Sequence, residues 1–199
     1  FNSLHRVKDI AQKLPSLRKI VVVPYASDNP DIDSVAQAVG YDDFCSFDQA
    51  IEVSFVQLPF SHPLYIMFTS GTTGLPKCMV QSAGGVLINH LKELILHTDC
   101  TPNDTIFYFT TCGWMMWNWL ISALAVGATL VLFDGNPFHP SPGTLWKMAE
   151  QEKVTIFGTS AGYIAALQNA EFKPREHFCI KDLKTILSTG SPLSTEGFE

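Results

Sequence analysis

Short apolar runs alternate with segments of helical apolar spacing along this sequence of 199 residues. Apolar residues with helical periodicity predict helices over 4–14, around 86–95, and over 114–126, 143–152 and 161–169. Runs of β-branched and aromatic residues predict strands over 19–24, 64–69, 105–111, 128–133, 154–159 and 183–189. A weak helical pattern covers 34–51. Because the strands are apolar and alternate with helices, we expect an α/β fold with a mostly parallel sheet flanked by helices.

One apolar stretch raises the question of a membrane span. Residues 105–133 contain no charged side chain, and 113–133 is long enough to cross a bilayer. Gly127 interrupts this stretch, the residues that follow it favour a strand, and neither flank carries a basic cluster. The pattern therefore predicts a buried helix followed by a buried strand, with no membrane span.

Composition excludes several classes of function. With a formal net charge of −6 and 13 basic residues scattered along the chain, the sequence lacks the basic patch of a nucleic-acid-binding protein. The cysteines number 5 and include no CxxC pair, which favours reduced thiols in a cytosol-like compartment. His90 and His97 lack further ligands at metal-binding spacing, so we expect no metal site formed by these histidines.

A loop rich in glycine and hydroxyl residues follows the predicted strand 64–69, in the sequence MFTSGTTGLPKCMV. Successive Gly, Ser and Thr residues can point several backbone N–H groups into one concavity, which binds an anion, and Lys77 adds a positive charge. The loop lacks the spacing of a Walker A motif, because Lys77 does not directly follow a glycine and Cys78 stands where a Ser or Thr is needed. The pattern predicts a phosphate-binding loop of another kind.

The segment FTSGTTGLPK resembles the phosphate-binding signature of the adenylate-forming superfamily, which includes acyl-CoA synthetases, luciferases and the adenylation domains of peptide synthetases. Downstream, ALAVGATLVLFDGNP and LKTILSTGSPLS are similar in order and spacing to the acetyl-CoA synthetase branch. The resemblance covers essentially the whole chain. It implies that residues 1–199 form part of the large N-terminal AMP-binding domain, without the C-terminal domain that carries the family's catalytic lysine.

The resemblance also implies a reaction in two steps. A carboxylate, here acetoacetate, attacks the α-phosphate of ATP to give an acyl-adenylate and pyrophosphate. The thiol of coenzyme A then attacks the acyl-adenylate and expels AMP. ATP with Mg²⁺ and coenzyme A as cosubstrate are the implied ligands, and the implied partners are small molecules.

Residue roles follow from the resemblance position by position. Lys77 takes a catalytic role on the polyphosphate, which is also held by Thr69, Ser70, Gly71, Thr72, Thr73 and Gly74. Adenine is expected to lie against Gly190, Ser191 and Pro192. Relatives usually have an acidic residue where this chain has Ser191. The acyl pocket is expected to involve Trp114, Met115 and Met116, and the alternative for these three residues is a purely structural place in the core.

Three functional hypotheses stay open at this point. The chain is a segment of an acetoacetate–CoA ligase, a segment of another short-chain acyl-CoA synthetase, or a truncated, non-catalytic remnant that at most binds nucleotide or a partner. Since the resemblance places the catalytic lysine domain outside these residues, we expect the 199-residue chain alone to make no CoA thioester.

Overall fold

Two units make up the chain, Phe1–Val56 and Gln57–Glu199. The computed structural model describes residues 3–25, 27–45, 52–69 and 74–198. Four residues of the predicted phosphate loop, 70–73, lie outside these described ranges. That residues 1–199 form part of one larger domain stays a prediction.

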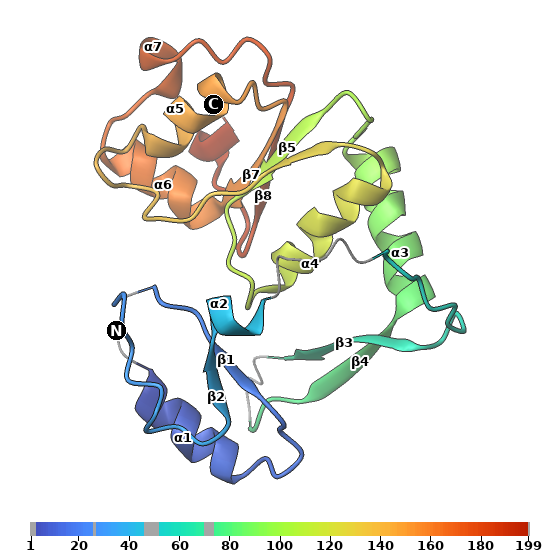
Figure 1. Ribbon diagram of the computed structural model, residues 1–199. Helices are drawn as coiled ribbons and strands as arrows, with labels where there is room; N and C mark the ends of the chain where they lie inside the picture. The colour runs from blue at the N-terminus through green and yellow to red at the C-terminus, as the bar shows by residue number, and fades with distance from the viewer. Residues whose placement is uncertain (1–2, 26, 46–51, 70–73, 199) are drawn as a thin grey trace. The chain divides into compact units, whose positions relative to one another are not determined.

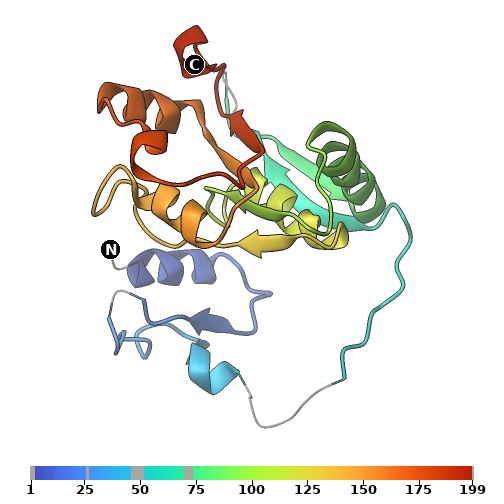
Figure 2. The same ribbon diagram turned by 90° about the horizontal axis from the view of Figure 1, so that it is seen from above.

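The first unit pairs two short strands with an amphipathic helix. Strand β1 (Ile20–Val22) runs parallel to β2 (Ala38–Gly40), with Ile20 opposite Ala38. Helix α1 (Leu4–Gln12) lies beside these strands, and the short helix α2 (Tyr41–Phe44) follows β2 (Figure 2). The predicted helix over 4–14 and strand over 19–24 are confirmed. The weak helical prediction for 34–51 is wrong at β2, because pairing with β1 outweighs the local pattern.

In the second unit, an antiparallel hairpin precedes the main sheet. Strand β3 (Pro63–Phe68) pairs with β4 (Cys78–Ser82), with Phe68 opposite Cys78 next to the loop. Strand 64–69 is confirmed as a strand, but the expectation that it joins the parallel sheet is wrong. Sequence reasoning also missed β4. The predicted phosphate loop therefore connects the two strands of a hairpin.

A long helical segment follows the hairpin. Helix α3 (Ala83–Leu91) begins at Ser82, whose hydroxyl oxygen accepts the backbone N–H of Gly85 over 3.3 Å. It continues into a π-helix, η1 (Lys92–His97). In the last turn, the Thr98 N–H donates to the Glu93 carbonyl oxygen, five residues back, over 2.9 Å. The predicted helix around 86–95 is confirmed, whereas its change to π geometry was not predicted.

A four-stranded parallel sheet is the centre of this unit, with strand order β6-β5-β7-β8. Its strands are β5 (Thr105–Tyr108), β6 (Thr129–Val131), β7 (Ile156–Ser160) and β8 (Thr185–Thr189). The connecting segments contain α4 (Met115–Ile121), the 3-10 helix η2 (Ser122–Ala125), α5 (Thr144–Gln151), α6 (Ala161–Asn169) and α7 (Pro174–His177), and η3 (Thr195–Phe198) follows β8. The alternation of strands and helices confirms the predicted α/β fold.

Both faces of the sheet are covered, with α5 and α6 on one side and α4 on the other (Figure 1). Side chains alternate along β5, so that Ile106 and Tyr108 point to the α4 side and Phe107 to the opposite core. On the α5 side, the Trp146 ring stacks on Phe157 with centroids 4.5 Å apart. Within the described ranges, no helix is long and apolar enough to cross a membrane.

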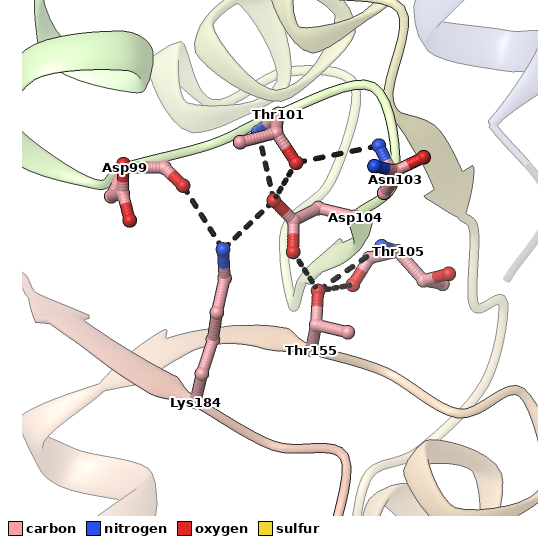
Figure 3. Close-up of polar contacts among 7 residues, drawn as sticks. All are labelled: Asp99, Thr101, Asn103, Asp104, Thr105, Thr155 and Lys184. Atoms are coloured by element: carbon pink, nitrogen blue, oxygen red, sulfur yellow. Dashed lines mark hydrogen bonds and ion pairs between the residues drawn. The ribbon is translucent and has the colours of Figure 1, made fainter.

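A buried carboxylate ties together the amino ends of three strands (Figure 3). Asp104 Oδ2 accepts from Lys184 Nζ at 2.8 Å and from the backbone and hydroxyl of Thr101, and its Oδ1 accepts from Thr155 Oγ1 at 2.7 Å. Burial alone would raise the pKa of Asp104, but these hydrogen bonds outweigh it and lower the pKa to about 2. Because ligands bind at the other edge of such sheets, this network serves stability.

Candidate functional site

A cavity of about 480 Å³ lies beside the carboxyl ends of β5 and β8, the edge where α/β sheets bind ligands. Its walls come from η1, α4 and the last residues of the two strands. The residues that line it are Glu93, His97, Thr98, Tyr108, Met115, Met116, Trp119, Leu187, Ser188 and Thr189. A volume of this size is within the range of small-molecule sites in proteins.

Tyr108 forms a fixed wall of the cavity. Its ring meets Trp119 edge-on, with centroids 6.1 Å apart, and its hydroxyl donates to the Thr159 carbonyl oxygen over 2.9 Å. A Cβ at Gly158 on the neighbouring strand would lie 2.0 Å from a Tyr108 ring carbon, so glycine is needed there for the ring to lie flat against β7. Burial raises the pKa of Tyr108 to about 12, so the phenol stays neutral and is not a general base.

The residues predicted for the acyl pocket lie at the start of α4. Met115 and Met116 line the cavity, and Met116 also packs against the core on this side of the sheet. Trp114 precedes the helix and contacts the Tyr108 ring edge-on at 6.3 Å, but it is not among the lining residues. The structure thus brings two of the three predicted residues to the cavity, while Trp114 contacts the Tyr108 ring.

Polar side chains form another part of the lining, the polar wall, and sequence reasoning missed it. Glu93, His97 and Thr98 come from the π-helical segment, and Ser188 and Thr189 come from the end of β8. The sequence pattern of 86–95 showed the apolar stripe of the helix alone. Glu93 and His97, four positions apart, would share a face in any helix and were the available signal, whereas Thr98, five positions from Glu93, joins them only because of the π-turn.

The described part of the phosphate loop is its base. The Lys77 N–H donates to Thr69 Oγ1 over 3.3 Å, and the Thr69 N–H donates to the Lys77 carbonyl oxygen over 3.0 Å. A side chain at Gly74 would meet open space, so packing does not require glycine at this position. The predicted ligands Ser70, Gly71, Thr72 and Thr73 lie outside the described residues.

Helix α4 links the cavity to the hairpin that carries this loop. Asn118, one turn beyond the methionines, donates from its amide to Met67 Sδ over 3.3 Å. The Ser122 hydroxyl donates to the Asn118 carbonyl oxygen over 3.1 Å, which leaves its oxygen to accept from His90 Nδ1 at 2.8 Å. Burial lowers the pKa of His90, while Glu93 opposes this shift. These contacts hold α3, α4 and β3 together.

The residues predicted to contact adenine follow directly after the cavity. Thr189 ends β8 and lines the cavity, and Gly190, Ser191 and Pro192 come next in the chain. Gly190 has a φ of +95°, a left-handed conformation that favours glycine. A nucleotide base at this turn would therefore lie next to a group bound in the cavity.

We searched the described residues, 3–25, 27–45, 52–69 and 74–198, for a metal site. They hold no group of three or more His, Cys, Asp or Glu side chains placed to bind an ion. His90 is hydrogen-bonded to Ser122, and His97 lines the cavity. The five cysteines are all free thiols.

Comparison with known proteins agrees with this arrangement. A model of the AMP-binding enzyme family matches residues 2–199. The chain belongs to this family. An acetoacetyl-CoA synthetase from Gallus gallus is 51% identical to this AMP-binding chain over 203 residues, and a malonamoyl-CoA synthetase from Penicillium aethiopicum is 38% identical over 215 residues. The matches cover 100% and 98% of the chain but 30% of each relative.

A solved structure gives the same result. The acetoacetyl-CoA synthetase from Streptomyces lividans superposes with a TM-score of 0.86 and 39% sequence identity, over 99% of this AMP-binding chain and 30% of that protein. The parallel sheet with its flanking helices is thus the fold of the corresponding region of an acyl-CoA synthetase. The chain spans about 30% of the length of the relatives it matches.

Proposed function

We propose that the complete protein containing this chain is an ATP-dependent acid–CoA ligase that activates acetoacetate. The observation that carries the proposal is the cavity at the carboxyl ends of β5 and β8, in a chain of the AMP-binding family. It adjoins the Gly190 turn on one side, and α4 connects it to the phosphate-loop hairpin through Asn118 on the other.

In the proposed reaction, a carboxylate oxygen of the acid bonds to the α-phosphorus of ATP and pyrophosphate leaves. The sulfur of coenzyme A then bonds to the acyl carbon, and AMP leaves. Reactions of this kind need positioning and charge neutralisation from the protein. Lys77 supplies positive charge to the polyphosphate, Met115 and Met116 bound the acyl group, and the turn at Gly190 contacts adenine.

ATP is proposed to act as its magnesium complex. Mg²⁺ is usually held by one or two carboxylates together with substrate phosphates. The described residues hold no group of three or more His, Cys, Asp or Glu side chains placed to bind an ion. The free thiols suit a reducing compartment, and we place the protein in the cytosol on this basis.

The choice of acid rests on the relatives and on the cavity. Acetoacetyl and malonamoyl, the acyl groups named in the relatives, are both short and both carry a carbonyl oxygen on the third carbon. A cavity with one apolar and one polar wall suits an acid of this kind. The alternative candidate is a ligase for a purely aliphatic short-chain acid, which the apolar wall of Met116, Trp119 and Leu187 would favour.

A panel of acids tests the proposal. The purified complete protein is incubated with ATP, coenzyme A and acetate, acetoacetate, butyrate or hexanoate, and the CoA thioesters are quantified by mass spectrometry. We expect the highest kcat/KM with acetoacetate. A preference for butyrate or acetate would favour the alternative ligase, and nucleotide binding without any thioester would indicate a non-catalytic protein.

A further inference from the structure

Three of the five residues of the polar wall come from the π-helical segment η1 and the residue that follows it. Glu93, His97 and Thr98 line the cavity together, although they are four and five positions apart. In η1 the hydrogen bonds close over five residues, as between the Thr98 N–H and the Glu93 carbonyl oxygen. Position i+5 therefore returns to the face of position i, which an α-helix would not allow. The π-turn thus adds Thr98 to the face that Glu93 and His97 would share in any helix.

These three residues differ in what they can offer a ligand. The Glu93 carboxylate accepts a hydrogen bond from the Asn89 amide at 3.4 Å and lies 3.6 Å from Lys92 Nζ. An ionised carboxylate cannot donate a hydrogen bond, whereas a neutral imidazole always carries one N–H donor and a threonine hydroxyl carries another. Within this segment the donors are therefore His97 and Thr98, and the hydroxyls of Ser188 and Thr189 at the end of β8 are further donors on the same wall. His97 is exposed at the rim, and Thr98 is buried.

The rest of the lining is largely apolar. Met116, Trp119 and Leu187 are partly or fully buried against the core, and the Tyr108 hydroxyl is already engaged with the Thr159 carbonyl oxygen. A short acid in this cavity would thus place its carbon chain against one wall and any further oxygen toward η1. Such an oxygen must accept a hydrogen bond, which a ketone or amide carbonyl does.

We infer that His97, assisted by Thr98, donates a hydrogen bond to a carbonyl oxygen on the third carbon of the acid and thereby selects 3-oxo acids over aliphatic acids of the same length. This inference rests on the proposed function and adds the residue that sets its specificity. The negative charge of Glu93 on this wall makes a separate contribution to specificity, because it disfavours acids with a second carboxylate.

The test compares acetoacetate with butyrate, which has the same number of carbons but lacks the 3-oxo oxygen. The kcat/KM of the complete protein is measured for both acids in the parent and in His97→Leu. A hydrogen bond of ordinary strength predicts a loss of about tenfold for acetoacetate and little change for butyrate. His97→Gln retains a side-chain N–H donor, so it should recover part of the acetoacetate activity.

Leu96→Gln is the matched control, because Leu96 lies on the same π-turn with 74% of its surface exposed and is not among the lining residues. It should leave the ratio of the two acids unchanged. An equal loss for both acids in His97→Leu, or an unchanged ratio, would overturn the inference while the proposed function stands. If the parent forms no acetoacetyl-CoA, the proposed function fails, and the inference fails with it.

Discussion

Substitution of Asp104 by asparagine should destabilise the parallel sheet by removing one negative charge while keeping the shape of the side chain. Asp104 is 4% exposed and receives hydrogen bonds from Lys184, Thr155 and Thr101. These contacts join the amino ends of β5, β7 and β8. In Asp104→Asn, an amide nitrogen replaces one of the two oxygens that now accept hydrogen bonds. This nitrogen is a donor and would face another donor, so the network cannot re-form unchanged.

The magnitude follows from the pKa of this carboxyl group. A value of about 2 in the folded chain, against an ordinary 3.8, corresponds to about 2 kcal/mol at neutral pH, since each pKa unit is worth about 1.36 kcal/mol. Loss of a partner from a fully buried ion pair costs about 3–5 kcal/mol. The Lys184 side chain is 38% exposed and can regain water, so we expect the lower figure of about 2 kcal/mol.

Urea denaturation followed by tryptophan fluorescence measures this change. All 4 tryptophans, Trp114, Trp117, Trp119 and Trp146, lie in the second unit, so the signal reports the unfolding of the sheet that Asp104 supports. Because the pKa of Asp104 is lowered on folding, its contribution is present above about pH 4 and is lost as the pH falls toward 2. The difference between parent and Asp104→Asn should shrink over the same range.

Asp99→Asn is the control for the loss of one charge near Lys184. Asp99 contributes its backbone carbonyl oxygen to Lys184 and has a φ of +53°, a conformation that asparagine tolerates well. The free energy of unfolding of Asp99→Asn should stay within about 0.5 kcal/mol of that of the parent. An equally small effect of Asp104→Asn at pH 7, or a difference that does not change on acidification, would refute the reasoning.

Three further predictions concern the loop, the cavity and α3. In the complete protein, Lys77→Ala should slow acid-dependent ATP–pyrophosphate exchange about 10²- to 10³-fold with little change in thermal stability; unchanged exchange would remove Lys77 from the phosphate site. Met116→Ala should shift kcat/KM toward hexanoate relative to acetoacetate, and an unchanged ranking of acids would separate Met116 from the acyl group. Because burial lowers the pKa of His90, its contribution to stability is present above about pH 6.5 and is lost as the pH falls below that value. His90→Gln should therefore flatten the pH dependence of thermal unfolding. An identical pH profile in the variant would contradict this role of His90.

Much of the second unit could be predicted from the sequence, because its strands are apolar and separated by well-patterned helices. The runs around Ile106 and Phe157 are buried on both faces of the sheet, which leaves a continuous apolar signal. Helix α6 has the predicted bounds, since Ser160 caps its first turn by accepting the Tyr163 N–H over 3.1 Å.

The elements that were missed depend on contacts distant in sequence or on unusual backbone geometry. Strand β4 is five residues long and largely exposed, so its strand conformation depends on pairing with β3 across the loop. Strand β2 is three residues long and likewise needs β1. The π-turn of η1 cannot be recognised from the spacing of apolar residues, because Leu94 is buried in it as it would be in an α-helix.

The candidate site also contains residues that could be predicted from the sequence and residues that could not. Met115 and Met116 were named from the resemblance alone and lie at the cavity, whereas His97 and Thr98 needed the structure. The order of residues along the chain gave no reason to place η1 opposite α4. The polar wall depends on the packing of η1, through Leu94, against the core that contains Tyr108, which is a tertiary property.

The decisive experiment is a crystal structure of the complete protein with a non-hydrolysable acetoacetyl-adenylate analogue, in which a sulfamate replaces the phosphate. We expect the acyl group in the cavity between Met116 and His97, with the adenine against Gly190, Ser191 and Pro192. An analogue bound with its acyl group outside this cavity, or no binding at concentrations that saturate related ligases, would contradict this expectation.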